Sequence, residues 1–195
     1  QHVKRQKLDQ PTGGAVHQGV AAIVAAHRYQ ELTEVLDSAN ERGEAPFLLV
    51  LDGIEDPQNL GSILRTADAA GVHGVIIPKR RAVGLTATVA KTSAGAIEYV
   101  PVVRVTNLVR TLQQLKAEGF WVTGAEASGE LPYTEVDFTV PTALVIGSEG
   151  KGISRLVREN CDYVVHLPMK GAVNSLNASV AAALIMYEVL RKRNT

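Results

Sequence analysis

Three short polar segments of this chain hold the residue types that could bind a ligand or carry out a reaction. They are residues 52–61, 147–152 and 168–177. The first is followed by a predicted helix that carries Arg65, and the second contains Glu149 among three glycines. Guanidinium and carboxylate groups can position a reacting group, move a proton or stabilise developing charge. Each segment is therefore a candidate part of a binding or catalytic site.

The glycine-rich segment 147–152 reads Gly-Ser-Glu-Gly-Lys-Gly and resembles a phosphate-binding loop only superficially. A Walker loop ends in Gly-Lys-Ser or Gly-Lys-Thr, whereas here Lys151 is followed by Gly152 and Ile153. The Gly-x-Gly-x-x-Gly fingerprint of dinucleotide-binding proteins is also absent from the expected place. Closely spaced glycines instead let the backbone turn sharply and approach a ligand, which favours a cofactor held by main-chain groups.

Short apolar runs that alternate with segments of helical periodicity predict an α/β protein with a mainly parallel sheet flanked by helices. Few of these runs contain polar residues, as expected for strands covered on both faces. The predicted strands are Phe47 to Leu51, Val75 to Ile77, Val100 to Val105, Phe120 to Ala125, Ala143 to Ile146 and Val164 to Leu167. Ligands bind beyond the carboxyl ends of the strands in such sheets. Each of the three polar segments follows a predicted strand, so we expect the site at that end of the sheet.

Clear helix signals lie between and after the predicted strands. Residues 60–70 end at Gly71, a typical helix stop, and Thr106 can cap a helix with leucines at positions 108, 112 and 115. The last helix is predicted from one apolar stripe, which consists of Leu176, Val180, Ala183, Leu184, Tyr187 and Leu190. It ends in the basic residues 191–193, which suit the negative end of the helix dipole. We favour that structural role over RNA contact.

Composition limits the class of protein. Lysine and arginine number 20, as do aspartate and glutamate, so the net charge of zero gives no argument for a polyanionic partner. No apolar run approaches the ~20 residues that a membrane span requires. The single cysteine, Cys161, cannot form an intramolecular disulfide, and we expect structural roles for it and for His166. These features predict a cytoplasmic protein with one main domain and no metal site.

The three polar segments together resemble the SPOUT superfamily of methyltransferases, in its SpoU or TrmH-like branch of RNA ribose 2'-O-methyltransferases. The resemblance covers Phe47 to Arg193. Its motifs are Leu51-Asp-x-x-x-Asp-Pro-x-Asn59-Leu-Gly-x-x-x-Arg65-x-Ala-x-x-x-Gly71, Ala143-Leu-Val-Ile-Gly147-x-Glu149-Gly-x-Gly152, and Leu167-Pro-Met-x-Gly171-x-x-x-Ser175-Leu-Asn177-x-Ser179. The order, the spacing and the strand-end placement of these motifs all agree with the family pattern.

The resemblance implies a fold whose last motifs thread into a C-terminal trefoil knot, although knots are very rare in proteins. It also implies that S-adenosylmethionine binds in the knot, largely through main-chain groups. The cofactor positions that it assigns are Ile146, Gly147, Leu167, Met169, Ser175, Leu176 and Asn177. Finally, it implies a homodimer in which the partner subunit completes the RNA site.

Family resemblance further assigns catalytic roles to Asn59, Arg65, Glu149, Ser175 and Asn177. A ribose hydroxyl is a poor nucleophile, so it must be aligned with the methyl group and lose its proton. Arg65 acts either as the general base or as a cation that grips a phosphate and stabilises the alkoxide. The second role is chemically simpler because a guanidinium stays protonated. Asn59 can cap its helix and also position Arg65 and Glu149.

Simple structural roles compete with several of these assignments. Glu149 suits the N-terminal end of a helix, but we favour a functional role. Ser175 and Asn177 are residue types that cap helices, so they can both cap the last helix and order the site. The best basic patch for RNA phosphates consists of Lys79, Arg80 and Arg81. A solvated surface loop explains this patch equally well.

The resemblance also divides the chain into three parts. The expected parts are residues 1–26, the end of an amino-terminal RNA-binding domain with the junction Gly14-Ala-Val-His17-Gln-Gly19-Val; residues 27–45, a linker; and residues 46–195, the methyltransferase domain. Within the first part, residues 15–25 read as one more strand. A helical linker follows through Arg42, with a turn at Gly43.

The junction sequence indicates which RNA is the substrate. Its resemblance is closest to enzymes that methylate a guanosine of 23S ribosomal RNA, and a tRNA ribose is the second candidate. The alternative from a different functional class is an RNA-binding or resistance factor that keeps the fold without the catalysis. The complete motifs argue against that alternative.

Overall fold

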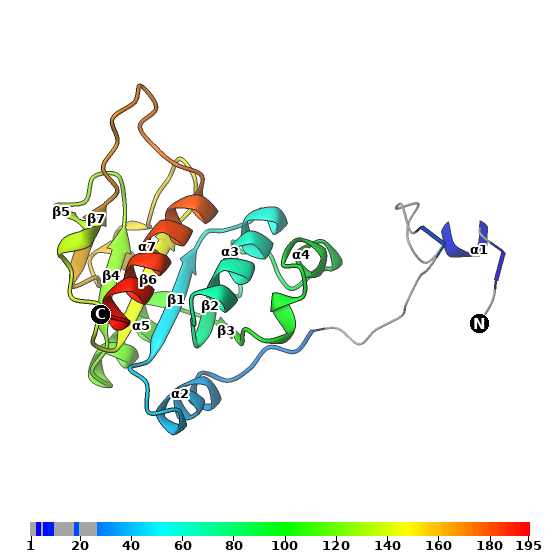
Figure 1. The fold of residues 1–195 in the computed structure, drawn as a ribbon, viewed down its shortest axis with the longest axis horizontal. Coiled ribbons are helices and arrows are strands. Elements are labelled where there is room, and N and C mark those ends of the chain that lie inside the picture. Colours follow the sequence, from blue (N-terminus) through cyan, green and yellow to red (C-terminus); the bar gives the residue numbers. More distant parts are fainter. Residues whose placement is uncertain (1–2, 5, 10–17, 20–26) are drawn as a thin grey trace.

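The computed structural model describes residues 3–4, 6–9, 18–19 and 27–195 (Figure 1). Among these residues, seven strands form one sheet in the order β3-β2-β1-β6-β4-β7-β5, and every pairing is parallel. The strands are β1 (Phe47–Asp52), β2 (Gly74–Pro78), β3 (Val102–Val105), β4 (Trp121–Ala125), β5 (Leu131–Pro132), β6 (Thr142–Gly147) and β7 (Tyr163–His166). The predicted α/β class is confirmed.

Helices cover both faces of this sheet. In the described part of the chain they are α1 (Gln6–Asp9), α2 (Leu32–Glu41), α3 (Pro57–Ala69), α4 (Ala87–Thr92), α5 (Leu108–Ala117), α6 (Arg155–Arg158) and α7 (Ala178–Arg193), with the 3-10 turns η1 (Ala96–Glu98) and η2 (Tyr133–Glu135). Leu49 and Leu51 of β1 belong to the core cluster that includes residues of α3 and α7, whereas Leu48 and Val50 belong to the cluster that includes residues of α2 and α5. None of the described helices has the length and apolar composition that crossing a membrane would require.

Six strands lie where the apolar runs predict them, with small shifts at their ends. The very short strand β5 was not predicted, because two residues carry no periodic signal. The predicted strand at residues 15–25 lies outside the described residues, except for Gln18 and Gly19. These two residues form a turn with φ angles of 49° and 89°, so they are not part of a strand.

Helix α3 begins earlier than the sequence predicts. Asp56 is its N-cap and accepts a hydrogen bond of 2.9 Å from the backbone N–H of Gln58, with Pro57 as the first helical residue. Proline is favoured there because the first N–H groups of a helix have no partner within it. The prediction that Asn59 caps this helix is therefore wrong. As a result, the Asn59 side chain is available for contacts outside the helix.

Helices α5 and α2 follow the sequence closely. Helix α5 buries the predicted leucines 108, 112 and 115, but Asn107 caps it in place of the predicted Thr106. The Asn107 Oδ1 accepts a hydrogen bond of 3.1 Å from the backbone N–H of Arg110. Helix α2 forms the predicted helical linker and is followed by a turn at Gly43 with a φ of 66°. Glycine suits that turn because other residues rarely adopt a positive φ.

The apolar stripe of α7 lies on the opposite side from the buried face. Ala182, Ile185, Met186 and Val189 are the residues of α7 that pack against the sheet. Val180, Leu184 and Tyr187 of the stripe are instead 47%, 45% and 51% exposed. Leu176 precedes the helix, which begins at Ala178. The predicted helix is therefore confirmed, but both of its sides are apolar, and periodicity alone could not show which side packs against the sheet.

The basic end of α7 has the structural role that the sequence analysis favoured. Arg193 donates hydrogen bonds to the backbone carbonyls of Ala45, Phe138 and Val140, the last two at 2.9 and 3.0 Å. Lys192 donates to the backbone carbonyls of Thr134 and Val136. Arg191 pairs with Glu188 one turn earlier. These bonds attach the end of α7 to η2 and to the loops before β1 and β6, so Lys192 and Arg193 serve the fold.

Candidate cofactor cavity and active site

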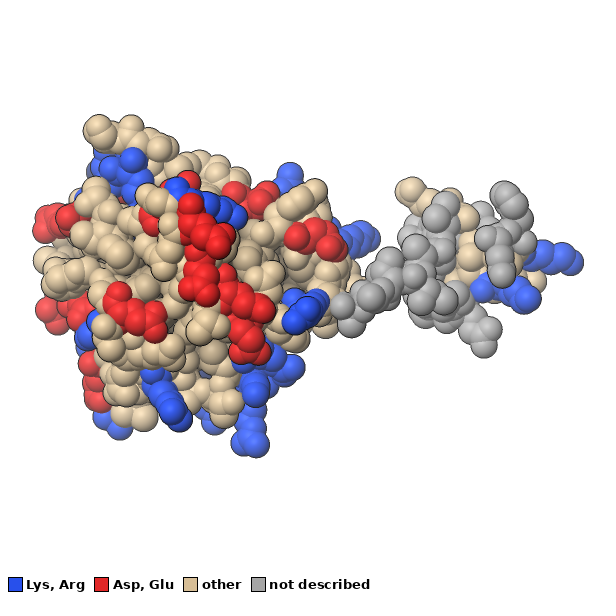
Figure 2. Space-filling view, turned by 90° about the horizontal axis from the view of Figure 1, so that it is seen from below, with Lys and Arg blue, Asp and Glu red and all other residues tan. Residues whose placement is uncertain are grey.

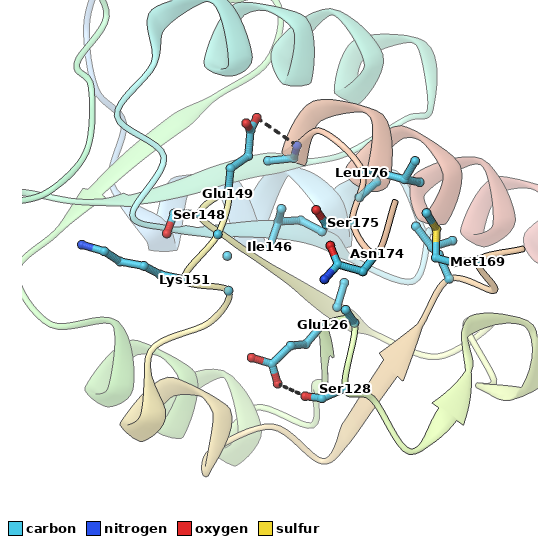
Figure 3. Close-up of a pocket in the computed structure, with 18 of the residues that line it drawn as sticks. Glu126, Ser128, Ile146, Ser148, Glu149, Lys151, Met169, Asn174, Ser175 and Leu176 are labelled. Carbon is cyan, nitrogen blue, oxygen red and sulfur yellow. Dashed lines mark hydrogen bonds between the residues drawn. The ribbon is translucent and has the colours of Figure 1, made fainter. Parts of the chain in front are cut away.

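A cavity of about 450 Å³ opens beyond the carboxyl ends of β4, β6 and β7 (Figure 3). Six of the seven predicted cofactor positions line it, and they are Ile146, Gly147, Leu167, Met169, Ser175 and Leu176. The seventh, Asn177, lies next to the wall but does not line the cavity. Strand-end loops supply almost all of the lining, as expected for a ligand site in a parallel sheet.

The glycine-rich segment forms a tight turn at one wall of this cavity. The backbone N–H of Ser148 donates to the carbonyl of Gly152 at 3.1 Å, and the N–H of Gly152 donates back at 2.9 Å. A Cβ atom on Gly147 would lie 2.1 Å from the carbonyl carbon of Gly152. Only glycine fits at Gly147, and the backbone of the turn therefore lies directly against the cavity.

Three predicted catalytic side chains meet beside the cavity, although they are far apart in the sequence. The Glu149 Oε1 accepts hydrogen bonds from Asn59 Nδ2 at 2.9 Å and from Asn177 Nδ2 at 2.6 Å. Asn177 Nδ2 also donates to Asn59 Oδ1 at 2.9 Å. The backbone N–H of Ala178 approaches the same carboxylate oxygen at 3.3 Å. We call Asn59, Glu149 and Asn177 the amide–carboxylate cluster.

Asn177 also caps α7, as the sequence predicts. Its Oδ1 accepts hydrogen bonds from the backbone N–H groups of Ser179 and Val180 at 3.0 and 3.3 Å. One side chain thus fixes the start of the helix and holds Glu149. Ser175 does not cap the helix, but it lines the cavity from the loop before α7. Ser175 is therefore placed to contact a ligand.

Arg65 does not join the amide–carboxylate cluster. It lies on α3, is exposed, and lines neither this cavity nor the neighbouring cleft. A helix turns by about 100° per residue, so Arg65 projects about 120° around α3 from Asn59. Within the described residues, no hydrogen bond or ion pair holds its guanidinium. Arg65 can therefore reach a molecule that docks against α3.

A second, larger cleft of about 1010 Å³ adjoins the cavity. The turn 148–152 forms part of the wall of both, and Asn59 and Glu149 line the cleft. Arg80 and Arg81 of the predicted basic patch line it as well, together with Lys151. Lys79 does not line it, and its backbone carbonyl accepts a hydrogen bond from Arg104. The amide–carboxylate cluster thus lies between the cavity and a cleft that carries basic side chains.

The face of the molecule shown in Figure 2 offers little for a polyanion. On the face shown in Figure 2, acidic side chains gather in a band and basic side chains lie mostly toward the edges. This mixture agrees with a net charge of zero. The basic residues of the cleft are consequently the best-placed phosphate contacts near the cavity.

Sequence reasoning missed part of the cavity wall. Glu126, Ser128 and Asn174 line it (Figure 3) but were not assigned to the site. Glu126 immediately follows β4, so the strand-end rule that found the other segments would also have found this residue. The signal was a single acidic residue without a recognisable motif around it.

The predicted structural roles of Cys161 and His166 agree with their surroundings. Burial raises the pKa of the Cys161 thiol to about 12, which leaves it protonated and a poor nucleophile. The His166 Nδ1 lies 2.9 Å from the backbone carbonyl of Gly129. Among the described residues, no group of three or more histidine, cysteine, aspartate or glutamate side chains could hold a metal ion.

Two family models match the chain. Residues 46–187 match the model of the SpoU rRNA Methylase family, which covers the whole sheet and most of α7. Residues 1–30 match a model described as RNA 2'-O ribose methyltransferase substrate binding. The match from residue 46 spans all three motifs on which the resemblance to SpoU or TrmH-like methyltransferases rests, and that resemblance is confirmed.

Known relatives and structures agree with the family models. YacO of Bacillus subtilis (strain 168), of the TrmH family of tRNA/rRNA methyltransferases, is 61% identical over the full chain, which spans 78% of YacO. The structure of the SpoU methyltransferase AviRb from Streptomyces viridochromogenes with AdoMet is similar with a TM-score of 0.72 and 36% identity, over 77% of this chain and 62% of AviRb. The TrmH/SpoU tRNA modifying enzyme of A. aeolicus gives 0.70 and 31%, over 84% of both chains. The chain therefore belongs to the SpoU rRNA methylase family.

Proposed function

We propose that this chain transfers a methyl group from S-adenosylmethionine to a ribose 2'-hydroxyl of RNA, with a guanosine of 23S ribosomal RNA as the target. The observation that carries the proposal is the position of the amide–carboxylate cluster. Glu149 lines both the cavity and the cleft with basic residues. A donor bound in the cavity and a hydroxyl bound in the cleft would meet at this cluster.

The lining of the cavity fits S-adenosylmethionine. Ile146, Leu167, Met169 and Leu176 present apolar surface for a planar base, and the turn at Gly147 presents main-chain groups. AviRb, which is similar in structure, was solved with this cofactor. When bound, S-adenosylmethionine supplies an electrophilic methyl group, and the chain itself needs to supply only binding, alignment and proton handling.

The protein residues divide these tasks. Asn59 and Asn177 hold the Glu149 carboxylate in place, so that its environment is ordered before the substrate binds. Arg65 remains cationic, binds a phosphate of the docked RNA and stabilises the ribose oxygen, while the proton of the hydroxyl passes to the Glu149 carboxylate between the cavity and the cleft. Arg80 and Arg81 in the cleft add phosphate contacts that fix the position of the strand. Ser175 contributes to alignment from the cavity wall.

We further propose the arrangement of the whole protein that the family resemblance implies. Residues 1–26 are the end of a substrate-binding domain, residues 27–45 are a linker and residues 46–195 are the catalytic domain. The match of residues 1–30 to the substrate-binding model supports the first of these parts. The chain after β7 passes through a trefoil knot before α7. The protein acts in the cytoplasm as a homodimer, and the exposed apolar side of α7 supports such an interface.

The test is methyl transfer to RNA. Labelled S-adenosylmethionine would be incubated with the protein and unmodified ribosomal RNA or tRNA, followed by nucleoside analysis. We expect labelled 2'-O-methylguanosine in 23S ribosomal RNA. Label in tRNA alone would keep the reaction and replace the substrate. Binding of both cofactor and RNA without transfer to either RNA would favour a non-catalytic RNA-binding or resistance factor.

A further inference from the structure

Glu126 is a carboxylate in the cofactor cavity to which the family resemblance assigns no role. It follows β4 directly and lines the cavity together with Ser128. Figure 3 shows Glu126 on the side of the cavity opposite Glu149, which lies near the start of α7. The amide–carboxylate cluster gives Glu149 a role but does not include Glu126. The presence of a second carboxylate in the cavity therefore needs its own explanation.

The Glu126 carboxylate is held in one orientation. Its Oε2 accepts a hydrogen bond of 2.9 Å from Arg158 Nε and another of 3.0 Å from Ser128 Oγ. The side chain is 19% exposed, so the ion pair with Arg158 is partly shielded from solvent. Within the part of the chain that the structure describes, the other oxygen, Oε1, has no hydrogen-bond partner. One oxygen thus fixes the side chain, and the other remains an open acceptor.

The glycine-rich turn leaves room for this open oxygen. Gly152 has a φ of 65°, and a Cβ atom there would lie 2.8 Å from Glu126 Oε1. Any larger residue at this position would be strained and would push the carboxylate away. Gly152 therefore allows an open acceptor to lie directly beside the turn that lines the cavity.

We infer that Glu126 Oε1 accepts a hydrogen bond from a ribose hydroxyl of the nucleoside cofactor, and this inference rests on the proposed function. A carboxylate accepts ribose hydroxyls in other nucleotide-binding folds by the same chemistry. Arg158 already neutralises the charge of Glu126. Such a neutralised carboxylate attracts an ammonium group weakly but still accepts a bond from a neutral hydroxyl. Glu126 is therefore assigned to the ribose rather than to the amino-acid end of the cofactor.

The test compares two nucleosides that differ only in the amino-acid part. S-adenosylhomocysteine carries both the ribose and the ammonium group, whereas 5'-methylthioadenosine carries the ribose but has no ammonium group. Binding of each would be measured by calorimetry for the wild type, Glu126→Ala and Glu126→Gln. We expect Glu126→Ala to weaken both ligands by the same factor, roughly tenfold, because a hydrogen bond to a charged group is lost. Glu126→Gln keeps an acceptor oxygen and should weaken both by less.

Matched controls separate this role from a loss of structure. Glu159→Ala removes a comparable ion pair with Arg155 on the same short helix, outside the cavity, and should leave both affinities unchanged. Weakened binding of S-adenosylhomocysteine alone would assign Glu126 to the ammonium group and overturn the inference. Unchanged binding of both ligands would also overturn it. A wild-type protein that binds neither ligand would instead contradict the proposed function.

Discussion

At the scale of single residues, the site depends on side chains that have more than one task. Asn177 caps α7 and holds Glu149, while Asn59 lies inside α3 and contacts both. A side chain held by two such hydrogen bonds can adopt few conformations, so the cluster is ordered without a ligand. Arg65 differs, because it is exposed and has no partner among the described residues.

This difference predicts the behaviour of Arg65→Ala. The substitution should reduce methyl transfer by more than 100-fold, on the order of what one stabilising group contributes, while cofactor affinity changes little because Arg65 does not line the cavity. Transfer would be measured with labelled cofactor, and affinity by calorimetry. Lys91→Ala, which removes an exposed cation from the neighbouring α4, is the matched control. Turnover close to wild type in Arg65→Ala would remove Arg65 from the mechanism.

Substitution of Leu176 is expected to weaken cofactor binding, unlike Arg65→Ala. It lines the cavity from the loop before α7, so Leu176→Glu should weaken cofactor binding by more than tenfold, because a charge is placed against an apolar ligand surface. Val173 lies in the same loop, is 67% exposed and does not line the cavity. Val173→Glu therefore serves as the control. Equal affinities in the two variants would contradict our placement of the cofactor.

His73 makes the stability of the fold depend on pH. Burial lowers its pKa below the usual 6.5, and this effect outweighs the nearby Glu44. The neutral ring accepts a hydrogen bond of 3.0 Å from the backbone N–H of Phe47, at the start of β1. Because the unfolded chain binds a proton more readily, the stabilisation is complete above pH 6.5 and is lost as the pH falls toward the lower, folded-state pKa.

Urea unfolding at pH 7.5 and pH 5.5 would measure this dependence. We expect the wild type to lose more stability between these values than His73→Ala, which has no ring to protonate. His166 lies 2.9 Å from the backbone carbonyl of Gly129 and has no hydrogen bond to Phe47, so His166→Ala serves as a control for the loss of a histidine elsewhere in the sheet. An identical loss in the wild type and His73→Ala would rule out His73 as the origin.

At the scale of elements, helix starts decide where the side chains of the amide–carboxylate cluster point. Helix α3 begins at Asp56 and Pro57, three residues before the position that the apolar pattern alone indicates. This earlier start places Asn59 inside the first turn. Its amide then reaches across to Glu149, which follows the neighbouring strand β6. The cap of α3 thus sets the geometry of the cluster.

Removal of that cap should be measurable. Asp56→Ala is expected to lower the free energy of unfolding by about 1 kcal/mol, the usual contribution of an N-cap. Asp56→Asn retains a side-chain oxygen that can accept the same bond from Gln58, so it should restore most of the loss. Denaturant unfolding of the three proteins would compare them. Equal losses in both variants would show that the charge, and not the cap, is what matters.

At the scale of the whole molecule, α7 has an exposed apolar side in addition to the side that packs against the sheet. Val180, Leu184 and Tyr187 together expose apolar area along α7, the helix that Asn177 of the cluster caps. A surface of this kind beside a site is typical of an interface. A homodimer formed there would bring a second copy close to each cavity.

Light scattering tests this arrangement. We expect about twice the chain mass of 20.8 kDa for the wild type, and the single-chain mass for Leu184→Glu, because a charge in an apolar interface is strongly unfavourable. Tyr99 is 79% exposed on a different part of the molecule. Tyr99→Glu should therefore remain dimeric. A wild-type monomer at micromolar concentration would contradict the proposed dimer.

The sequence by itself determined the class of the fold, the positions of six strands and the three strand-end segments that form the site. These features are local, because an apolar run or a motif is read from neighbouring residues. Only the tertiary structure decided that Asn59, Glu149 and Asn177 share hydrogen bonds and that the apolar stripe of α7 is exposed. Each of these depends on the order of strands in the sheet and on which helix face packs against it. Long-range packing sets both, and no local pattern encodes them.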